Sequence, residues 1–224
     1  YKHIPSNGAN GQFLRYSSAG TAAWASGLLD YNNFVHYVHR TSNGSTNGGT
    51  LTGQQRNVRT LNAVVTNNNA SNGGTKWGHM GGASVGESPY NSATYNNQII
   101  LDTGTYFCMI WGIGIDTDEQ QIMLVNNTAG KFLVNGMNSD SSGASNGYPI
   151  MAQGTFTLSA DNQVCQIEHW VNTTPSSSSV GTEAQGRGLF HGTIPDGAGG
   201  TDNDSDFYNY QYDMYTSIMI WKVG

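Results

Sequence analysis

Histidine, carboxylate and serine side chains are the groups of this 224-residue sequence that could support catalysis. His36 and His39 are three residues apart in a strand-like stretch, so they point to opposite sheet faces and cannot chelate one metal together. His169 lies on the same face of its strand as the apolar residue Ile167, so we expect a buried, hydrogen-bonded histidine. Glu168 and Glu183 form no recognisable carboxylate pair. We therefore expect no catalytic site, and leave open a glycosidase pair that forms only in space.

An acidic stretch from Asp202 to Asp206 has the oxygen spacing that begins a calcium loop. Its sixth position is Phe207, where the loop needs glycine, and its twelfth is Asp213, where a bidentate glutamate belongs. These departures exclude an EF-hand, and a looser calcium site and a solvated acidic loop both stay open. We expect no cofactor and assign no metal ligand. Asp116–Glu119 is a second acidic turn, for which a plain strand connection is the simpler interpretation.

Aromatic residues lie beside amide and acidic residues in two long polar stretches, 66–97 and 172–213. Proteins hold neutral sugars with this mixture, because aromatic faces stack on the sugar ring and amides or carboxylates bond its hydroxyl groups. Loops longer than 12–15 residues are usually functional or disordered, so we expect the binding surface there. The alternative is that these aromatics only anchor the loops. The candidate ligand-binding residues are Trp77, Tyr90, Tyr208 and Tyr210 for stacking, with Asp204 and Asp206 as hydrogen-bond acceptors.

The two cysteines, Cys108 and Cys165, both lie in apolar, strand-like runs. Two cysteines do not make a disulfide framework, and a buried thiol behaves as a small hydrophobic side chain. Free, buried thiols are the favoured interpretation, and a single disulfide is the alternative. Metal binding has no support, because no second cysteine or histidine stands at ligand spacing.

The composition places limits on fold and partners. Hydrophobic residues make up 37% of the chain, and the 30 glycines raise the apolar share to about half, so a packed core is possible. Charged residues are only 11%, against roughly 25% in ordinary soluble domains. The net charge of −6 argues against nucleic acid or an anionic membrane as partner. No apolar run is long enough to span a bilayer, and the first residue, Tyr1, suggests a processed chain or a fragment.

Short β-type segments separated by Gly, Asn and Ser fill the sequence, and no segment is typical of a helix. About ten strands without helices predict an all-β, antiparallel sandwich or barrel. The predicted strands are 12–16, 21–24, 34–40, 57–65, 98–101, 105–115, 120–126, 132–135, 150–158, 163–171 and 215–223.

Two of these strands, at 106–111 and 218–221, are apolar on both faces. A strand in a two-sheet sandwich turns one face to the core and the other to water, so a second apolar face needs a cover. A long loop could supply it, but the long loops here are very polar, which favours an interface with further copies of the chain. The residues expected near or beneath that interface are Tyr106, Met109, Trp111, Met219 and Trp221.

Four stretches, in order along the chain, resemble the sequence patterns of one known family. The first is Asn47–Thr50 followed by Arg56–Asn62, which is similar to a turn and an R-x-R-x-L-N strand. The second is Leu101–Tyr106, similar to L-P-A-G-T-Y, followed at the right distance by Leu124–Thr128.

The other two stretches lie in the second half of the chain. Gly154–Leu158 and Gln166–His169 resemble F-x-L and E-I-Q-H strands, and Met214–Lys222 resembles a terminal V-Y-x-x-V-x-I-W-K strand. The family is the trimeric jelly-roll knobs of bacteriophage and algal-virus tail or head fibre proteins. Its fold is similar to tumour necrosis factor and to the globular heads of complement proteins. The resemblance implies an antiparallel jelly-roll sandwich over residues 32–224.

Residues 1–31 resemble the β-hairpins found in fibre shafts just before such knobs. Gly8–Tyr16 is similar to N-G-Q-x-L-x-Y, and Ala23-Trp24 ends the hairpin. A hairpin with one apolar face, here Phe13 and Trp24, is not stable alone and must pack on other structure. The resemblance thus divides the chain into a shaft-like hairpin segment and a knob.

Together these features imply a viral fibre knob: a non-catalytic homotrimer on the virion surface that contacts other virion proteins. It would recognise a host-surface glycan or protein through threefold avidity. Two alternatives share the fold: a purely structural virion component, such as a head decoration, and a secreted lectin-like module. The long stretches 66–97 and 172–207 depart from the family pattern, so no ligand residue is transferred from it.

Overall fold

The computed structural model describes most of the predicted strands and only parts of the segments that connect them. The described residues are 7–8, 12–18, 21–26, 33–42, 51–68, 78–80, 97–115, 117–141, 147–173 and 212–223. They form fourteen β-strands and no α-helix. The described part of the chain accordingly contains no helix of the length and hydropathy that a membrane span requires.

The first two strands form a sheet of their own. β1 (Gln12–Ser18) and β2 (Thr21–Ser26) are antiparallel and pair with no other described strand. Phe13 and Leu14 are exposed on this hairpin. The hairpin predicted for this segment is therefore present, and its division from the rest of the chain at residues 31 and 32 stays a prediction.

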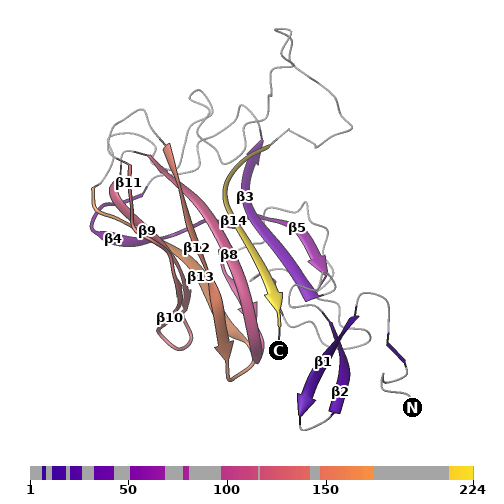
Figure 1. The fold of residues 1–224 in the computed structure, drawn as a ribbon. Helices are drawn as coiled ribbons and strands as arrows, with labels where there is room; N and C mark the ends of the chain where they lie inside the picture. Colours follow the sequence, from indigo (N-terminus) through magenta and orange to yellow (C-terminus); the bar gives the residue numbers. More distant parts are fainter. Residues whose placement is uncertain are drawn as a thin grey trace.

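One layer of the sandwich is a five-stranded antiparallel sheet with the order β12-β8-β14-β3-β5. Its longest pairing joins β8 and β12 over twelve residue pairs without a bulge (Figure 1). The strands are β3 (Phe34–Ser42), β5 (Ala63–Asn68), β8 (Gly104–Ile115), β12 (Gly147–Leu158) and β14 (Tyr212–Lys222).

The other layer is a seven-stranded sheet built on the path β10-β9-β13-β7-β6. Two short strands extend it, since β11 pairs with β9 and β4 pairs with β13. The strands are β4 (Gln55–Val58), β6 (Gly78–Met80), β7 (Ile99–Leu101), β9 (Asp118–Asn126), β10 (Lys131–Asn135), β11 (Ser139–Ser141) and β13 (Gln163–Val171).

The strand order identifies the topology. In chain order, the eight main strands are β3, β7, β8, β9, β10, β12, β13 and β14. The first pairs with the eighth, the second with the seventh, the third with the sixth and the fourth with the fifth. This nested antiparallel pairing over two packed sheets is a jelly roll. The predicted fold class, an all-β antiparallel jelly-roll sandwich, is confirmed.

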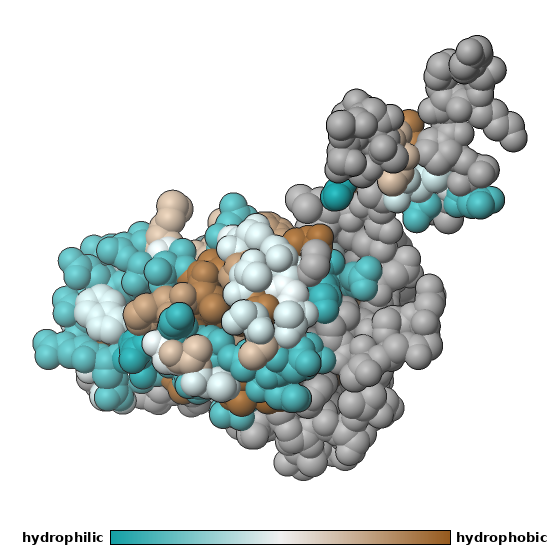
Figure 2. Space-filling view, turned by 90° about the horizontal axis from the view of Figure 1, so that it is seen from below, coloured by the Kyte–Doolittle hydropathy of each residue, from teal (hydrophilic) through white to brown (hydrophobic). Residues whose placement is uncertain are grey.

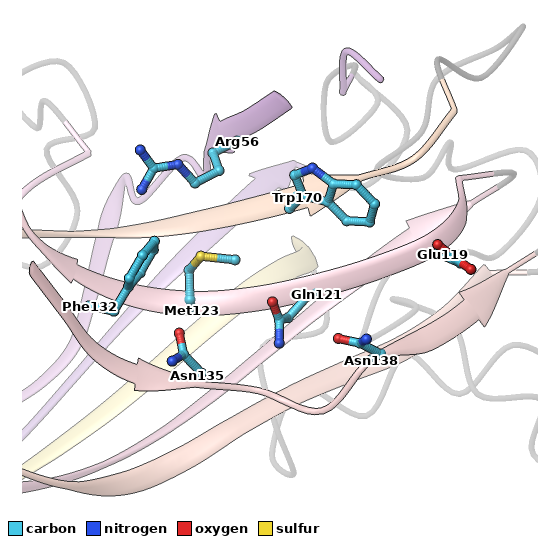
Figure 3. A pocket seen from close by; sticks show the side chains of 8 residues that line it. All are labelled: Arg56, Glu119, Gln121, Met123, Phe132, Asn135, Asn138 and Trp170. Atoms are coloured by element: carbon cyan, nitrogen blue, oxygen red, sulfur yellow. The ribbon is translucent and has the colours of Figure 1, made fainter. Parts of the chain in front are cut away.

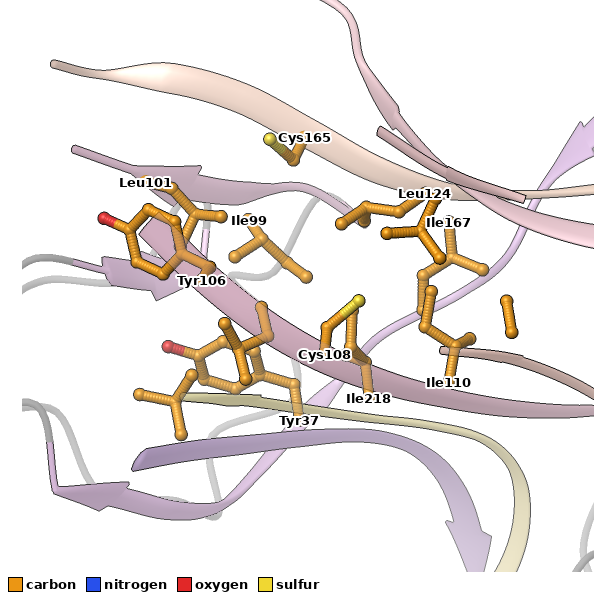
Figure 4. Packing of buried hydrophobic residues seen from close by; sticks show 14 of the residues in the cluster. Tyr37, Ile99, Leu101, Tyr106, Cys108, Ile110, Leu124, Cys165, Ile167 and Ile218 are labelled. Carbon is orange, nitrogen blue, oxygen red and sulfur yellow. The ribbon is translucent and has the colours of Figure 1, made fainter. Parts of the chain in front are cut away.

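The core lies between the two sheets and is lined by alternate residues of their long strands. β8 contributes Tyr106, Cys108 and Ile110, and β13 contributes Cys165 and Ile167, all of them fully buried. Figure 4 shows these side chains meeting from the two layers. Outside the core, Figure 2 shows brown apolar residues interspersed among teal polar ones, as is usual for a folded protein surface.

The strand predicted at 57–65 is divided in two. β4 ends at Val58 in the seven-stranded sheet and β5 begins at Ala63 in the five-stranded sheet, so the chain crosses between layers at residues 59–62. The side chains of Arg59 and Leu61 are buried at this crossing. Residues 66–68 belong to β5 and residues 78–80 form β6, both inside the stretch predicted as a loop. These are corrections to the predicted boundaries.

Candidate functional site

The outer face of the five-stranded sheet carries most of the residues predicted for an interface. Met109 and Trp111 on β8, and Met219 and Trp221 on β14, alternate with buried core residues and therefore point away from the core. Met109 lies directly opposite Met219 in the strand register. All four side chains are partly exposed in the single chain.

Aromatic contacts fix the position of Trp221 on this face. Its ring lies 4.7 Å from that of Phe34 and 5.8 Å from that of Phe107, measured between ring centroids. Phe34 is on β3 and Phe107 on β8, so three neighbouring strands contribute one ring each. Met151 of β12, opposite Trp111, is exposed and extends the face to the edge strand. We call this surface, formed by Phe34, Phe107, Met109, Trp111, Met151, Met219 and Trp221, the apolar face.

Tyr106, the fifth residue predicted for the interface region, points in the opposite direction. It is fully buried, stacks on Phe156 at 5.4 Å between ring centroids, and donates a 2.6 Å hydrogen bond from its hydroxyl to the Asp102 carbonyl. Burial raises the pKa of its hydroxyl above the ordinary value. Tyr106 therefore supports the apolar face from beneath. Phe34 and Phe107 were missing from the predicted set, although strand parity alone places Phe107 on the same side as Met109.

One polar pair lies at the apolar face. His36 Nε2 is 2.8 Å from the Ser217 hydroxyl on the neighbouring strand. Burial lowers the pKa of His36 to about 4, so the ring is neutral at pH 7. His39 lies on the other side of β3, against Tyr215, and its pKa is also lowered to about 4, first by burial and then by the charge of Arg59. The sequence prediction that these two histidines point to opposite faces is confirmed.

A buried polar cluster around Arg59 joins the two layers. Its Nε donates to the Thr216 hydroxyl at 2.8 Å, its Nη2 to the Tyr215 carbonyl at 2.7 Å, and its Nη1 to the Ile113 carbonyl at 3.2 Å. Arg59 is fully buried, and burial lowers its pKa to about 9. All three acceptors belong to β8 or β14 of the five-stranded sheet. The guanidinium therefore attaches the segment that follows β4 to that sheet.

His169 extends that cluster into the seven-stranded sheet. Its Nδ1 is 3.4 Å from Arg59 Nη1, and its Nε2 is 3.0 Å from Gln120 Oε1. Because the guanidinium can only donate, Nδ1 accepts and the Nε2 proton is donated to Gln120. Burial and then the charge of Arg59 lower the pKa of His169. The predicted buried, hydrogen-bonded histidine is confirmed, and its two hydrogen bonds connect Arg59 to Gln120 of the seven-stranded sheet.

The two cysteines face the core from opposite layers, on β8 and β13 (Figure 4). Both are buried free thiols, in agreement with the favoured interpretation. Burial raises the pKa of each thiol to about 12. A thiol with that pKa contains almost no reactive thiolate at pH 7.

The six residues predicted to bind ligand lie outside the described part of the chain, as do most of the candidate calcium loop and Asp116. The acidic turn does connect two strands, since β8 ends at Ile115 and β9 begins at Asp118. Among the described residues, no three His, Cys, Asp or Glu side chains are close enough to hold a metal ion together.

No protein-family model matches the chain, and no curated protein matches it. Among solved structures, the chain is similar to two crystal structures of murine APRIL, obtained at pH 8.5 and pH 8.0. Each is 9% identical in sequence with a TM-score of 0.38, and each match covers 84% of this chain and 97% of that chain. The jelly-roll assignment therefore depends on the strand pairing described above.

Proposed function

We propose that this protein is the homotrimeric knob of a viral fibre, an adhesin that recognises a host-surface glycan or protein without a catalytic step. The observation that carries the proposal is the apolar face. Four neighbouring strands place aromatic rings or methionine side chains on the outside of the five-stranded sheet. A surface of this kind on a polar, weakly charged protein is typical of a protein–protein interface.

A second copy of the chain is the occupant that fits this face best. The face carries no described Lys, Asp or Glu at its centre, and methionine and aromatic side chains pack well against copies of themselves. Closed assemblies of identical chains bury the same patch on every subunit. The number three comes from the resemblance of Leu101–Tyr106, Gly154–Leu158 and Met214–Lys222 to the strands of trimeric fibre knobs.

Recognition is assigned to the long stretches 66–97 and 172–213. Their aromatic and acidic residues, Tyr208 and Tyr210 above all, supply the stacking surfaces and acceptors that a neutral sugar needs. Three copies on one trimer would bind a dense cell surface with an avidity above that of each site. The proposal includes a location on the virion surface, in contact with other virion proteins.

The test is attachment to the host-cell surface by the purified chain carrying both Tyr208→Ala and Tyr210→Ala. We expect attachment at least tenfold weaker than that of the unsubstituted chain, because each lost ring removes a stacking surface of about 1 kcal/mol or more. The thermal midpoint should stay within about 2 °C, since surface substitutions cost about 0.5 kcal/mol or less.

Two results would contradict this assignment. If attachment is unchanged, these tyrosines do not bind ligand. If the thermal midpoint falls together with attachment, the tyrosines anchor their loops, and the alternative of a structural virion component gains support.

A further inference from the structure

The outer face of the seven-stranded sheet contains a groove that the predictions from sequence did not include. It has a volume of about 510 Å³ and is lined by residues of four strands and the β10–β11 connection. The lining residues are Arg56, Glu119, Gln121, Met123, Phe132, Asn135, Asn138 and Trp170. Figure 3 shows Trp170 and Phe132 on either side of β9, with Met123 and Gln121 between them.

Strand register explains why these side chains meet. Trp170 of β13 lies directly between Arg56 of β4 and Gln121 of β9. Two residues further along β9, on the same side of the sheet, Met123 lies opposite Asn135 of β10. Residues paired across neighbouring strands point to the same side of the sheet, here away from the core. Met123 is buried and forms the floor of the groove.

Two aromatic surfaces border the groove. Phe132 is 54% exposed, and the guanidinium carbon of Arg56 lies 5.1 Å from the centre of its ring. Trp170, on β13, is partly exposed. Ring faces held in place in this way, with open surface beside them, can stack on the apolar CH groups of a sugar ring.

Amide groups lie along the other side of the groove. Gln121 Nε2 donates to the Gly136 carbonyl at 2.8 Å, which fixes that side chain and leaves its oxygen as an acceptor. Asn135 and Asn138 are exposed, and within the described part of the chain their side-chain amides make no hydrogen bond. Free amides beside aromatic rings can satisfy the paired donor and acceptor of a sugar hydroxyl.

The charges of the groove oppose an anionic ligand. Arg56 is the cation of the lining, and its Nη1 lies 3.0 Å from Glu168 Oε2. Glu168 is nearly buried and also accepts a 2.8 Å hydrogen bond from Gln166 Nε2. Glu119 adds a second carboxylate at the other end. With its one cation paired to Glu168 and a further carboxylate in the lining, the groove favours a neutral ligand over a sulfate, phosphate or sialic acid.

We propose that this groove binds a neutral saccharide, with the sugar ring stacked on Trp170 and its hydroxyl groups bonded to Asn135, Asn138 and Gln121. The volume suits a ligand of one or two sugar rings. The proposal deepens the recognition function proposed above, on which it rests, and adds a sheet-face site to the loop surface assigned there. The groove and the apolar face lie on different sheets of the sandwich and share no residue, so the same residue is not required for both assembly and saccharide binding.

The experiment measures binding of the purified chain to an array of neutral oligosaccharides that end in hexoses, N-acetylhexosamines or fucose, followed by titration of the best one. Trp170→Ala tests stacking. The double substitution Asn135→Ala with Asn138→Ala tests the amides, and both positions are exposed enough to leave folding unaffected. Tyr148→Ala, an exposed aromatic outside the groove, is the matched control.

We expect the affinity of both groove variants to fall at least tenfold, with the control unchanged. The chain carrying Tyr208→Ala and Tyr210→Ala should keep this binding. If the loop variant loses it and the groove variants keep it, the groove proposal is wrong and the loop assignment stands. If the unsubstituted chain binds no saccharide on the array, the groove proposal is also wrong, and the adhesin would have to recognise a protein.

Discussion

The two outer faces of the sandwich are built from the same kind of strand and end up chemically different. On the five-stranded sheet, the outward positions of β8 and β14 include Phe107, Met109, Trp111, Met219 and Trp221, together with Ser217. On the seven-stranded sheet, the outward positions of β9 and β13 are Glu119, Gln121, Met123, Gln166, Glu168 and Trp170.

Each face has tryptophan and methionine, so apolar content alone does not separate them. The difference is what surrounds those residues. On the apolar face, rings pack on rings, as Trp221 does on Phe34 and Phe107. In the groove, Trp170 is flanked by Arg56 and Gln121. A face that excludes water at its centre suits a large protein partner, and one that mixes rings with polar groups suits a small polar ligand.

Assembly should respond most strongly to substitution on the apolar face. Met219→Glu puts a carboxylate at the centre of the apolar face, beside Met109 and His36. Burying an unpaired charge at an interface costs several kcal/mol per subunit, so the assembly should dissociate to monomers at micromolar concentration. Native mass spectrometry reports the change directly. Met137→Glu, at a residue that is 79% exposed, is the control and should leave the assembly intact. If the Met219→Glu variant forms an unchanged oligomer, the apolar face is not part of the interface.

A matched pair of tryptophan substitutions compares the two faces with the same chemistry. Trp221→Ala removes a ring that packs on two others, so we expect a loss of about 2–4 kcal/mol of stability together with weaker assembly. Trp170→Ala removes a ring at the edge of an open groove, and its cost should be about 1 kcal/mol, with no effect on assembly. Chemical denaturation at fixed protein concentration measures both. Equal losses would mean that the two faces are equally packed in the assembled protein.

The histidines of β3 make the five-stranded layer sensitive to acid. His36 and His39 have pKa values lowered to about 4 by burial, whereas the unfolded chain takes up these protons near pH 6.5. The unfolded state therefore binds more protons in this interval, and stability falls as the pH is lowered from about 6.5 to about 4. We expect a loss of about 1–3 kcal/mol for each histidine. Thermal midpoints measured between pH 7.5 and 4.5 test this, and His36→Gln should reduce the slope. A midpoint that does not change across this range would contradict the burial of both rings.

The smallest effect is expected from thiol chemistry. Cys108 and Cys165 are buried with pKa values of about 12, so iodoacetamide at pH 7.5 should leave both unmodified in the folded protein. In denaturant without reductant both should be alkylated, giving a mass increase of two adducts. A chain that resists labelling in denaturant would contain a disulfide, and rapid labelling of the folded chain would mean that the core opens readily.

The strands were predictable because their alternation is regular and turn residues separate them, as in β13, where Cys165, Ile167 and His169 point inward. The break between β4 and β5 at Arg59 was not predictable. A basic residue in a strand-like run normally stays on the surface, and only tertiary hydrogen bonds reveal that Arg59 is buried. The strands β6 and β11 are three residues long and contain Gly, Ser or Asp, which favour turns.

The candidate sites were predictable only in part for a related reason. Parity within a single strand places Met109, Trp111, Met219 and Trp221 outside the core, so most of the apolar face follows from local sequence. The groove combines Arg56, Phe132 and Trp170, which are far apart in sequence, and depends on the register among β4, β13, β9 and β10. No spacing rule within one strand contains that information.

We propose that other copies of the chain cover the apolar face. Sedimentation equilibrium of the purified, unsubstituted chain at micromolar concentration measures this. The proposed trimer predicts a single species with three times the 24.0 kDa mass of one chain. A stable, folded monomer of 24.0 kDa would contradict the claim.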